Sequence, residues 1–397
     1  MRVGAAASAR TAARLVVALP GLALLVLLPA TASRAQTAAS VALNATPVQI
    51  TVGQDVSLTV QIDPPAADET VSIVDANGRI VATGTTGAAG RFDVAISPTS
   101  STTVHAEWGA LTSAETTIGV RADVRVRLGS IRLGGATVVR GHVRPAVAGA
   151  RADVTLVLGG QAVSTHHPLV GAAGGFRTRF RVPLPGSYRV RARFADADHL
   201  AGTDEDGPRS TPLPTLRPGS HGVSVRLLER RLVALHYRLV GIDGGFDART
   251  ADAVMAFRKV QRMPRTTTVD AAVWRALADP LVPRPRAATD GFHIEVDQSR
   301  QVLYTVKDGA VTNIIHVSTG KPSTPTRDGS FFVTRKIAGY SEHQLYYPSY
   351  FDGARAIHGW PDVPSYAASH GCVRVPYWHA KWVFGLAPVG TRVVVYH

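Results

Sequence analysis

The chain has 397 residues, of which 45% are hydrophobic and only 18% are charged. This length and composition permit several domains, each with its own core, and argue against wholesale disorder. The formal net charge is +14, but the chain has neither a dense Lys/Arg run nor aromatic residues interleaved with basic ones. We therefore expect no nucleic-acid partner.

The N-terminus is typical of a secretory signal. Arg2, Arg10 and Arg14 accompany the apolar run LVVALPGLALLVLLPA, and the small residues of TASRAQ follow it. We predict a signal peptide over residues 1–35, cleaved after Ala35. The apolar run is short for a membrane span, so an uncleaved anchor is the alternative, and it would be the only contact with a membrane. No cysteine lies in this region, which excludes a lipoprotein.

An exported basic chain is attracted to anionic surfaces. The first 35 residues hold four arginines and no acidic residue, so a net charge of +10 remains after cleavage. A bacterial cell wall is such an anionic surface. We therefore predict a location in the cell wall or periplasmic space, with anionic cell-wall polymers as partners.

Residues from about 41 to 205 alternate apolar and polar side chains in short runs such as DVSLTVQI, which predicts strands and turns. The segment GAAGRFDVAIS at Gly87 returns as GAAGGFRTRFRV at Gly171. Two tandem Ig-like β-sandwiches, over residues 41–121 and 122–205, fit this period. Because neither contains a cluster of catalytic residue types, we interpret both as spacers.

Residues 206–218 are rich in Pro and Gly and are predicted to form a linker. Beyond it, Val225, Leu228 and Leu232 share one helical face, and Asp247 can cap a second helix. A third helix is predicted in DAAVWRALA. The pattern indicates a small three-helix domain over 219–279, followed by a second linker over 280–290.

Three segments of this domain, GSHGVSVRLLERRL, DGGFDARTADAVMAF and VDAAVWRAL, resemble the peptidoglycan-binding domain found beside many wall enzymes. The resemblance implies peptidoglycan glycan as a partner. Where that family usually has glutamine, this chain has Glu229 and Arg258. A helical packing module without a ligand is the alternative.

From Phe292 onward the period returns to two, and QVLYTVKDGAVTNIIHVSTG predicts a hairpin that turns at Lys307, Asp308 and Gly309. Further strands are predicted in GSFFVTRKI and in the terminal TRVVVYH. Residues 291–397 are thus expected to form one β-rich domain.

Cys372 is the only cysteine of the chain. Exported proteins normally use cysteines in disulfide pairs, so a lone one is either incidental or a reactive thiol. A thiol attacks a carbonyl carbon as thiolate, and a histidine that takes its proton activates it. His370 lies in a tight Gly-containing turn next to Cys372, a poor position for presenting its ring to the sulfur. We therefore predict His358 as the base.

The residues around Cys372 suggest how a substrate would be held. Gly371 allows a sharp turn, so that the N–H groups of Gly371 and Cys372 could converge on a developing oxyanion. Arg374 is suited to hold a substrate carboxylate. Tyr346 and Tyr347, in the aromatic run YYPSYF, are expected beside the bound substrate.

The segment AIHGWPDVPSYAASHGCVRV resembles the signature of the L,D-transpeptidase (YkuD-like) catalytic domain. The matching residues are His358, Ser369, His370, Gly371, Cys372 and Arg374. The resemblance covers the region 291–397. It implies that a tetrapeptide stem acylates the cysteine with loss of D-alanine, and that the acyl group passes to the side-chain amine of a neighbouring stem as a 3→3 cross-link. It implies no cofactor.

Three alternatives remain open. An L,D-carboxypeptidase of the same fold would use water as the acceptor. A zinc site could use Cys372, His370 and His358, although exported catalytic zinc sites more often use His and carboxylate ligands. A non-catalytic wall-binding protein would lose nothing if the thiol were blocked. The predicted fold class is multidomain and mainly β: two tandem β-sandwich modules, a small three-helix domain and a β-rich L,D-transpeptidase catalytic domain, with no metal.

Overall fold

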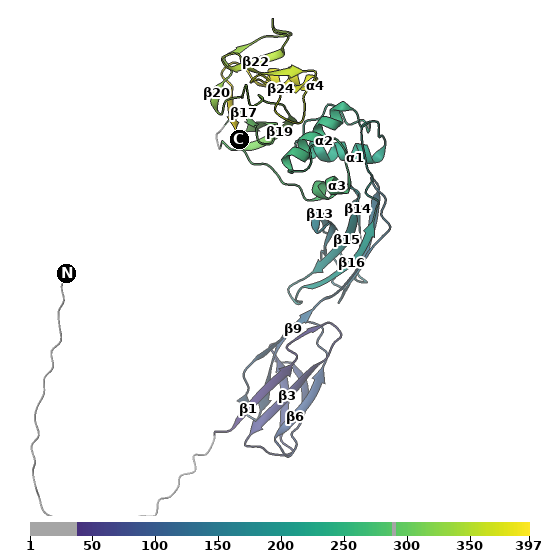
Figure 1. Ribbon diagram of the computed structural model, residues 1–397. Helices are drawn as coiled ribbons and strands as arrows, with labels where there is room; N and C mark the ends of the chain where they lie inside the picture. Colours follow the sequence, from purple (N-terminus) through teal and green to yellow (C-terminus); the bar gives the residue numbers. More distant parts are fainter. Residues whose placement is uncertain (1–37, 288–290) are drawn as a thin grey trace, which may run out of the picture.

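The computed structural model describes residues 38–287 and 291–397. The predicted signal segment, residues 1–35, lies outside them. Within the described ranges, no helix has both the length and the apolar character that a membrane crossing requires. The modules follow one another in chain order along an elongated molecule (Figure 1), and the predicted mainly β class is confirmed.

The first module is a β-sandwich. One sheet has the order β1-β3-β6, and the facing sheet has the order β2-β9-β7-β4-β5, with β8 beside β7. Inward side chains of both sheets form a separate core that includes Leu58, Ile73 and Ile118. The strands are β1 Ser40–Thr46, β2 Gln49–Thr51, β3 Val56–Asp63, β4 Thr70–Asp75, β5 Ile80–Thr85, β6 Arg91–Ile96, β7 Thr102–Trp108, β8 Leu111–Thr112 and β9 Thr116–Arg121.

The second module is also a sandwich, with sheets β10-β11-β14 and β13-β12-β15-β16. Its last strand pairs Ser210 with Ser187, so strand structure continues into the segment predicted as a linker. The backbone hydrogen bonds of this pairing outweigh the local Pro and Gly content. The strands are β10 Asp123–Leu128, β11 Ala136–Arg144, β12 Asp153–Leu158, β13 Gln161–His166, β14 Gly175–Arg181, β15 Ser187–Phe194 and β16 Gly202–Ser210.

The sequence repeat forms the same turn in both modules. The N–H of Gly90 donates to the carbonyl of Gly87, and the N–H of Gly174 donates to that of Gly171. Gly90 has φ 69° and Gly174 has φ 81°, a region that favours glycine. These turns lead into β6 and β14, which occupy equivalent places in the two modules.

Three helices follow: α1 Val223–Ala234, α2 Ala248–Val260 and α3 Ala271–Ala278. The predicted cap is confirmed, because the Asp247 side chain accepts hydrogen bonds from the N–H groups of Arg249 and Thr250. Asp270 caps α3 in the same way through the N–H of Val273.

The C-terminal module contains two sheets, β19-β18-β17-β25-β20 and β21-β22-β23-β24. Helix α4, which the sequence did not predict, covers β22, β23 and β24. The elements are β17 Phe292–Asp297, β18 Val302–Lys307, β19 Ala310–His316, β20 Gly329–Phe332, β21 Arg335–Lys336, β22 Tyr346–Asp352, β23 Arg355–Trp360, β24 Val373–Pro376, α4 Tyr377–Leu386 and β25 Arg392–Tyr396.

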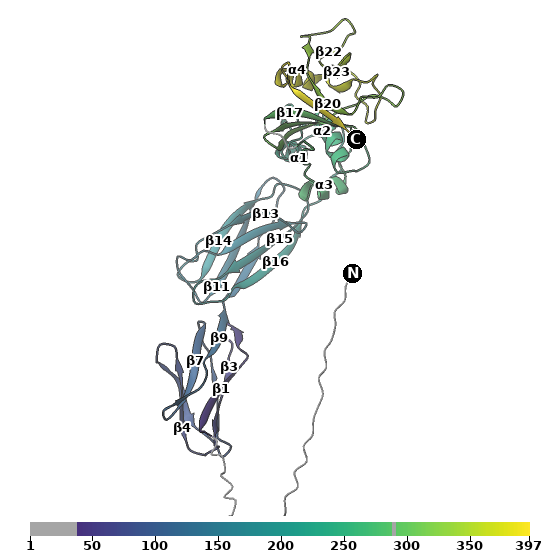
Figure 2. The ribbon, with the colours of Figure 1, turned by 90° about the vertical axis from the view of Figure 1, so that its left-hand side faces the viewer.

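The last three modules are packed together. One continuous apolar core joins the second sandwich, the helices and the outer side of β18 and β19, with Val190, Phe257 and Tyr304 among its residues. Figure 2 shows the helices between the second sandwich and the sheet that contains β17. The helical domain therefore forms a structural support for the C-terminal module.

Candidate functional site

Strands β23 and β24 place the predicted residues on one face of a sheet. The two strands are parallel, with Ile357 opposite Val373 and His358 opposite Arg374. Side chains two residues apart on a strand share a face, so Cys372, directly before β24, lies on the same face as His358 and Arg374. The Cα atoms of His358 and Cys372 are expected about 8 Å apart from the strand spacing and rise, which an imidazole side chain can span.

The thiol of Cys372 lies against the backbone of β23. Its Sγ is 3.4 Å from the N–H of Ala356 and 3.9 Å from the carbonyl oxygen of Ala354. Burial raises the pKa of Cys372, while the N–H of Ala356 and the charges of Arg355 and Arg374 act in the opposite direction. The resting side chain is therefore a thiol, which requires a base before it can attack.

His358 is suited to be that base. Only 3% of its surface is exposed, and burial lowers its pKa to about 4, so the ring is neutral at pH 7. Its Nδ1 lies 2.9 Å from the carbonyl oxygen of Gly359, which requires a proton on Nδ1 and leaves Nε2 as an acceptor. Among the described residues no hydrogen bond joins this ring to Cys372.

Ser369 shapes the turn before the thiol. Its hydroxyl donates to the carbonyl of Cys372 at 2.6 Å and accepts from the N–H of Gly371 at 3.1 Å. Gly371 has φ 109°, and a Cβ there would meet the Arg355 side chain at 2.9 Å, so this position requires glycine. The N–H of Gly371 is thus already used. The expectation that it faces an oxyanion together with the N–H of Cys372 does not match this geometry.

The ring of His370 lies beside Lys321. It is exposed, and its Nε2 lies 3.3 Å from the Nζ of Lys321. The structure therefore does not bring His370 together with Cys372 and His358, as the zinc alternative would require. Within residues 38–287 and 291–397, no group of three or more His, Cys, Asp or Glu side chains could hold a metal ion.

Arg374 lies beside His358 and is half-buried. Its backbone N–H donates to the carbonyl of Ser318, and its carbonyl accepts from the N–H of Ser318. The guanidinium carbon is 5.2 Å from the centre of the Trp360 ring, which lies on the same face. A carboxylate could therefore be held next to the base.

Tyr346 and Tyr347 lie elsewhere. Tyr346 pairs with Gly359, whose side faces α4, and its ring is 5.0 Å from that of Tyr377. The Tyr347 ring is 5.1 Å from that of Phe384 in α4. Because they pack on the side of the sheet opposite His358, the substrate-binding role expected for them is not retained.

Several residues of the site were not found from the sequence. Thr326 donates its hydroxyl to the carbonyl of Gly371 at 3.0 Å and accepts from the N–H of Gly320 at 2.9 Å. Arg355 packs on Gly371 and forms an ion pair of 3.0 Å with Asp352. The hydroxyl residues in VSTGKPSTPTRDG were a signal for Thr326, whereas none existed for Arg355.

The helical domain reaches the loop over residues 361–368, which precedes Ser369. The Nζ of Lys259 in α2 is 2.6 Å from the Nδ1 of His316, and the Nε2 of His316 is 2.7 Å from the carbonyl oxygen of Val363. Arg265 donates to the carbonyl of Ser365 at 2.8 Å. The loop is therefore held by residues from two modules.

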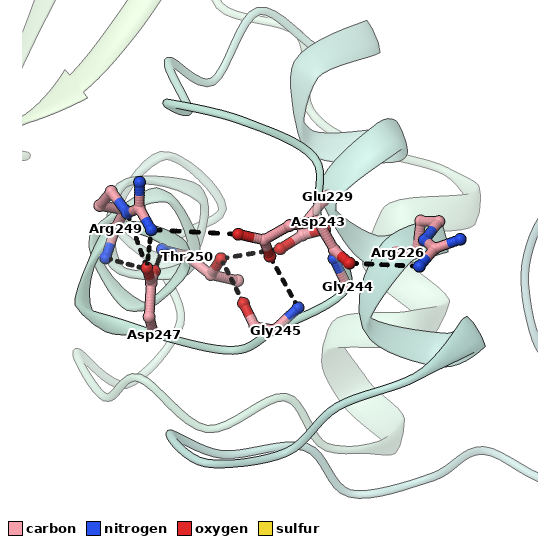
Figure 3. A network of polar contacts seen from close by, with 8 residues as sticks. All are labelled: Arg226, Glu229, Asp243, Gly244, Gly245, Asp247, Arg249 and Thr250. Carbon is pink, nitrogen blue, oxygen red and sulfur yellow. Dashed lines mark hydrogen bonds and ion pairs between the residues drawn. The ribbon is translucent and has the colours of Figure 1, made fainter.

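The unusual Glu229 of the helical domain has a structural role. Its carboxylate accepts from the N–H of Gly244 at 2.8 Å and from the hydroxyl of Thr250 at 3.0 Å (Figure 3). Burial raises the pKa of Glu229. Arg258, the other unusual residue, forms an ion pair of 2.8 Å with Asp270. Both side chains thus stabilise loops within the domain.

Comparison with protein families assigns two of the modules. Residues 291–395 match the L,D-transpeptidase catalytic domain (YkuD), and residues 221–277 match a putative peptidoglycan binding domain. Residues 25–128 match a family of unknown function (DUF7263). No curated protein matches the chain.

Solved structures similar to this chain include three described as L,D-transpeptidases. One from Xylanimonas cellulosilytica is 33% identical, covering 47% of this chain and 100% of that one, with a TM-score of 0.45. One from Stackebrandtia nassauensis is 22% identical, covering 47% and 98%, with a TM-score of 0.31. The catalytic domain from E. faecium is 29% identical, covering 28% and 100%, with a TM-score of 0.26.

Proposed function

Because this chain belongs to the L,D-transpeptidase family, with the family's catalytic domain at residues 291–395, we propose that it forms 3→3 cross-links in peptidoglycan through a thioester on Cys372. The observation that carries the proposal is that the only cysteine of the chain shares a sheet face with a buried, neutral His358.

In the acylation step, Nε2 of His358 takes the proton of the Cys372 thiol as Sγ attacks the carbonyl carbon of the third stem residue. A carbon–sulfur bond forms, and the carbonyl oxygen becomes an oxyanion. Among the residues that the structure describes, no acceptor pairs with the N–H of Cys372, so this donor is free for the oxyanion. The bond to D-alanine then breaks, and its amine leaves with the proton from His358.

In the transfer step, the side-chain amine of a neighbouring stem attacks the thioester. His358 removes a proton from that amine, the new amide forms, and the thiolate regains its proton. Arg374 binds the terminal carboxylate of the donor stem in this scheme, because it is charged and lies next to His358. Ser369 and Gly371 maintain the turn that presents the thiol.

The match to a peptidoglycan-binding domain at residues 221–277 supports a complementary role for the helices. We propose that they bind glycan near the catalytic module, and that the protein is exported to the cell wall or periplasmic space.

Intact-mass spectrometry with a disaccharide tetrapeptide tests the proposal. The wild-type protein should gain the mass of the acyl group with loss of D-alanine, and Cys372→Ala should gain no mass. Circular dichroism checks that the Cys372→Ala variant is folded. With an acceptor stem present, a cross-linked dimer is expected. A tripeptide as the only product would indicate the L,D-carboxypeptidase, and full turnover by Cys372→Ala would refute the proposed nucleophile.

A further inference from the structure

The sheet β10-β11-β14 of the second sandwich presents arginines on its outer side. Along each strand, buried apolar residues alternate with exposed ones, and the exposed positions are dominated by one residue type. We call this surface the arginine face, defined by Arg125, Arg127, Arg140, Arg144, Arg177, Arg179 and Arg181.

Three of these arginines lie directly opposite one another. Arg127 pairs with Arg140, and Arg140 pairs with Arg177. Residues in such positions have Cβ atoms about 5 Å apart, and like charges placed there destabilise a sheet. Along β14, Arg177 and Arg179 follow at a strand spacing of about 7 Å. The face thus has a row of positive charges across the strands, at Arg127, Arg140 and Arg177, and a column along β14, at Arg177 and Arg179.

Few acidic residues neutralise the face. Arg125 has an ion pair of 3.1 Å with Asp123, and Arg127 has a longer one of 3.9 Å with Asp206. The remaining five arginines form no ion pair with any described residue.

The other sheet of the same module differs. Arg189 and Arg191 of β15 contact Glu205 at 2.8 and 2.5 Å, and Arg193 lies 3.8 Å from Asp153. The arginines of that sheet are therefore compensated within the module.

The first module shows that the fold does not require these arginines. The positions equivalent to Arg127, Arg140 and Arg177 are occupied by Asn44, Thr59 and Asp93, which lie opposite one another in the same register. Residues 38–121 hold three arginines and eight acidic residues, whereas residues 122–210 hold thirteen arginines and seven acidic residues. Two modules with the same turn and pairing thus carry net charges of −5 and +6.

The arginine face also has room for a ligand. A shallow hollow of about 670 Å³ is bordered by Arg140 and Arg177, and small or apolar residues such as Leu169 and Ala172 line the rest. A lining that combines two arginines with apolar groups fits a chain in which anionic groups alternate with neutral units.

We propose that the arginine face binds a linear phosphodiester polymer of the bacterial cell envelope. Guanidinium groups match phosphate oxygens in bidentate geometry, and a polymer with regularly spaced phosphates can contact the row and the column together. The choice of an envelope polymer over nucleic acid rests on the proposed function. An anionic membrane fits less well. The first module lies next to the face on its N-terminal side (Figure 1), and its net charge of −5 would be repelled by an anionic membrane.

The experiment uses the chain without residues 1–35 and end-labelled poly(glycerol phosphate), with affinity measured by fluorescence anisotropy from 50 to 300 mM salt. The test variant carries Arg140→Gln, Arg177→Gln and Arg179→Gln. The matched control carries Arg189→Gln, Arg191→Gln and Arg193→Gln, the same change of charge in the same module. The test variant should bind about tenfold or more weakly, and its dependence of log K on log salt should be shallower by about 2–3.

The control variant should lose less than about twofold, since its arginines are already paired. Equal losses in both variants would show attraction by net charge alone and overturn the proposal. Tighter binding of single-stranded DNA of equal charge, or of phosphatidylglycerol vesicles, through the same three arginines would overturn the choice of polymer. Circular dichroism checks that both variants are folded. Turnover of a soluble tetrapeptide by the wild-type protein is measured without the polymer. This measurement tests the proposed catalytic function independently of polymer binding.

Discussion

Cys372 and His358 share a sheet face, and both are neutral at rest. Burial acts on both, since it raises the pKa of the thiol and lowers that of the imidazole. A thiolate and an imidazolium at rest would need the opposite shifts. The proton is therefore expected to move when the substrate is bound and the thiol attacks. An acid limb in the ordinary histidine range, which is the usual expectation for a histidine base, does not fit this environment.

The pH profile of kcat/KM tests this arrangement. A histidine base works only when neutral, so activity should fall as pH drops through the pKa of His358, which burial lowers to about 4. His358→Ala should lower the rate about 10²–10⁴-fold. His370→Ala is the matched control and should lose much less, because its ring faces Lys321. An acid limb near 6.5, or a larger loss for His370→Ala, would show that the base is misassigned.

At the scale of elements, α2 contributes directly to the catalytic module. Lys259 is only 3% exposed and donates to the carbonyl oxygens of Gln301 at 2.9 Å and Val317 at 3.0 Å, as well as contacting His316. Burial lowers the pKa of His316 to about 3, so its ring is neutral and can accept from Lys259 while donating to Val363. This chain of hydrogen bonds connects α2 to the loop before Ser369.

Lys259→Met should disrupt that connection. It leaves two buried carbonyl groups without their donor, at a cost of about 1–3 kcal/mol each, and it removes the hydrogen bond to Nδ1 of His316. We expect a lower melting temperature and faster hydrogen exchange of residues 361–368, measured by mass spectrometry. Lys307→Met, which removes an exposed lysine, is the control. Unchanged exchange in the Lys259 variant would show that the loop is held without α2.

At the scale of the whole molecule, the first sandwich is nearly independent. Its core is separate from the one shared by the second sandwich, the helices and the catalytic sheet. The junction includes polar contacts such as those of Ser101 N–H to the carbonyl of Asp198 and of His199 to the carbonyl of Thr99, both at 2.8 Å. The last three modules, by contrast, share a continuous core and are expected to unfold together.

Removal of residues 1–121 tests this division. The remaining chain keeps its continuous core, so its melting temperature should stay within a few degrees of the parent chain's main transition. Its kcat/KM for a soluble tetrapeptide should stay within about twofold. Scanning calorimetry should show the loss of one transition and no other. A tenfold loss of kcat/KM would show that the first module supports the catalytic one.

The elements that were predicted correctly from the sequence are those indicated by local patterns of side chains. Alternation with period two indicated the sandwiches and the catalytic hairpin, and the helical period with Asp247 as a cap indicated α2. These elements follow from which side chains avoid water along a single segment. Helix α4 was missed because YWHAKWVFGL has apolar and aromatic residues on most sides, which gives no amphipathic period.

The sequence by itself determined the order of the modules, their mainly β class, the family of the catalytic domain and the presence of a lone cysteine within a recognisable motif. Only the tertiary structure decided which side chains share a face. In the structure, Tyr346 and Tyr347 pack on the α4 side of the sheet. The N–H of Gly371 donates to the hydroxyl of Ser369, and Lys259 contacts His316. Such contacts join residues far apart in the chain, and the pairing register that creates them is set by the packing of whole sheets and helices.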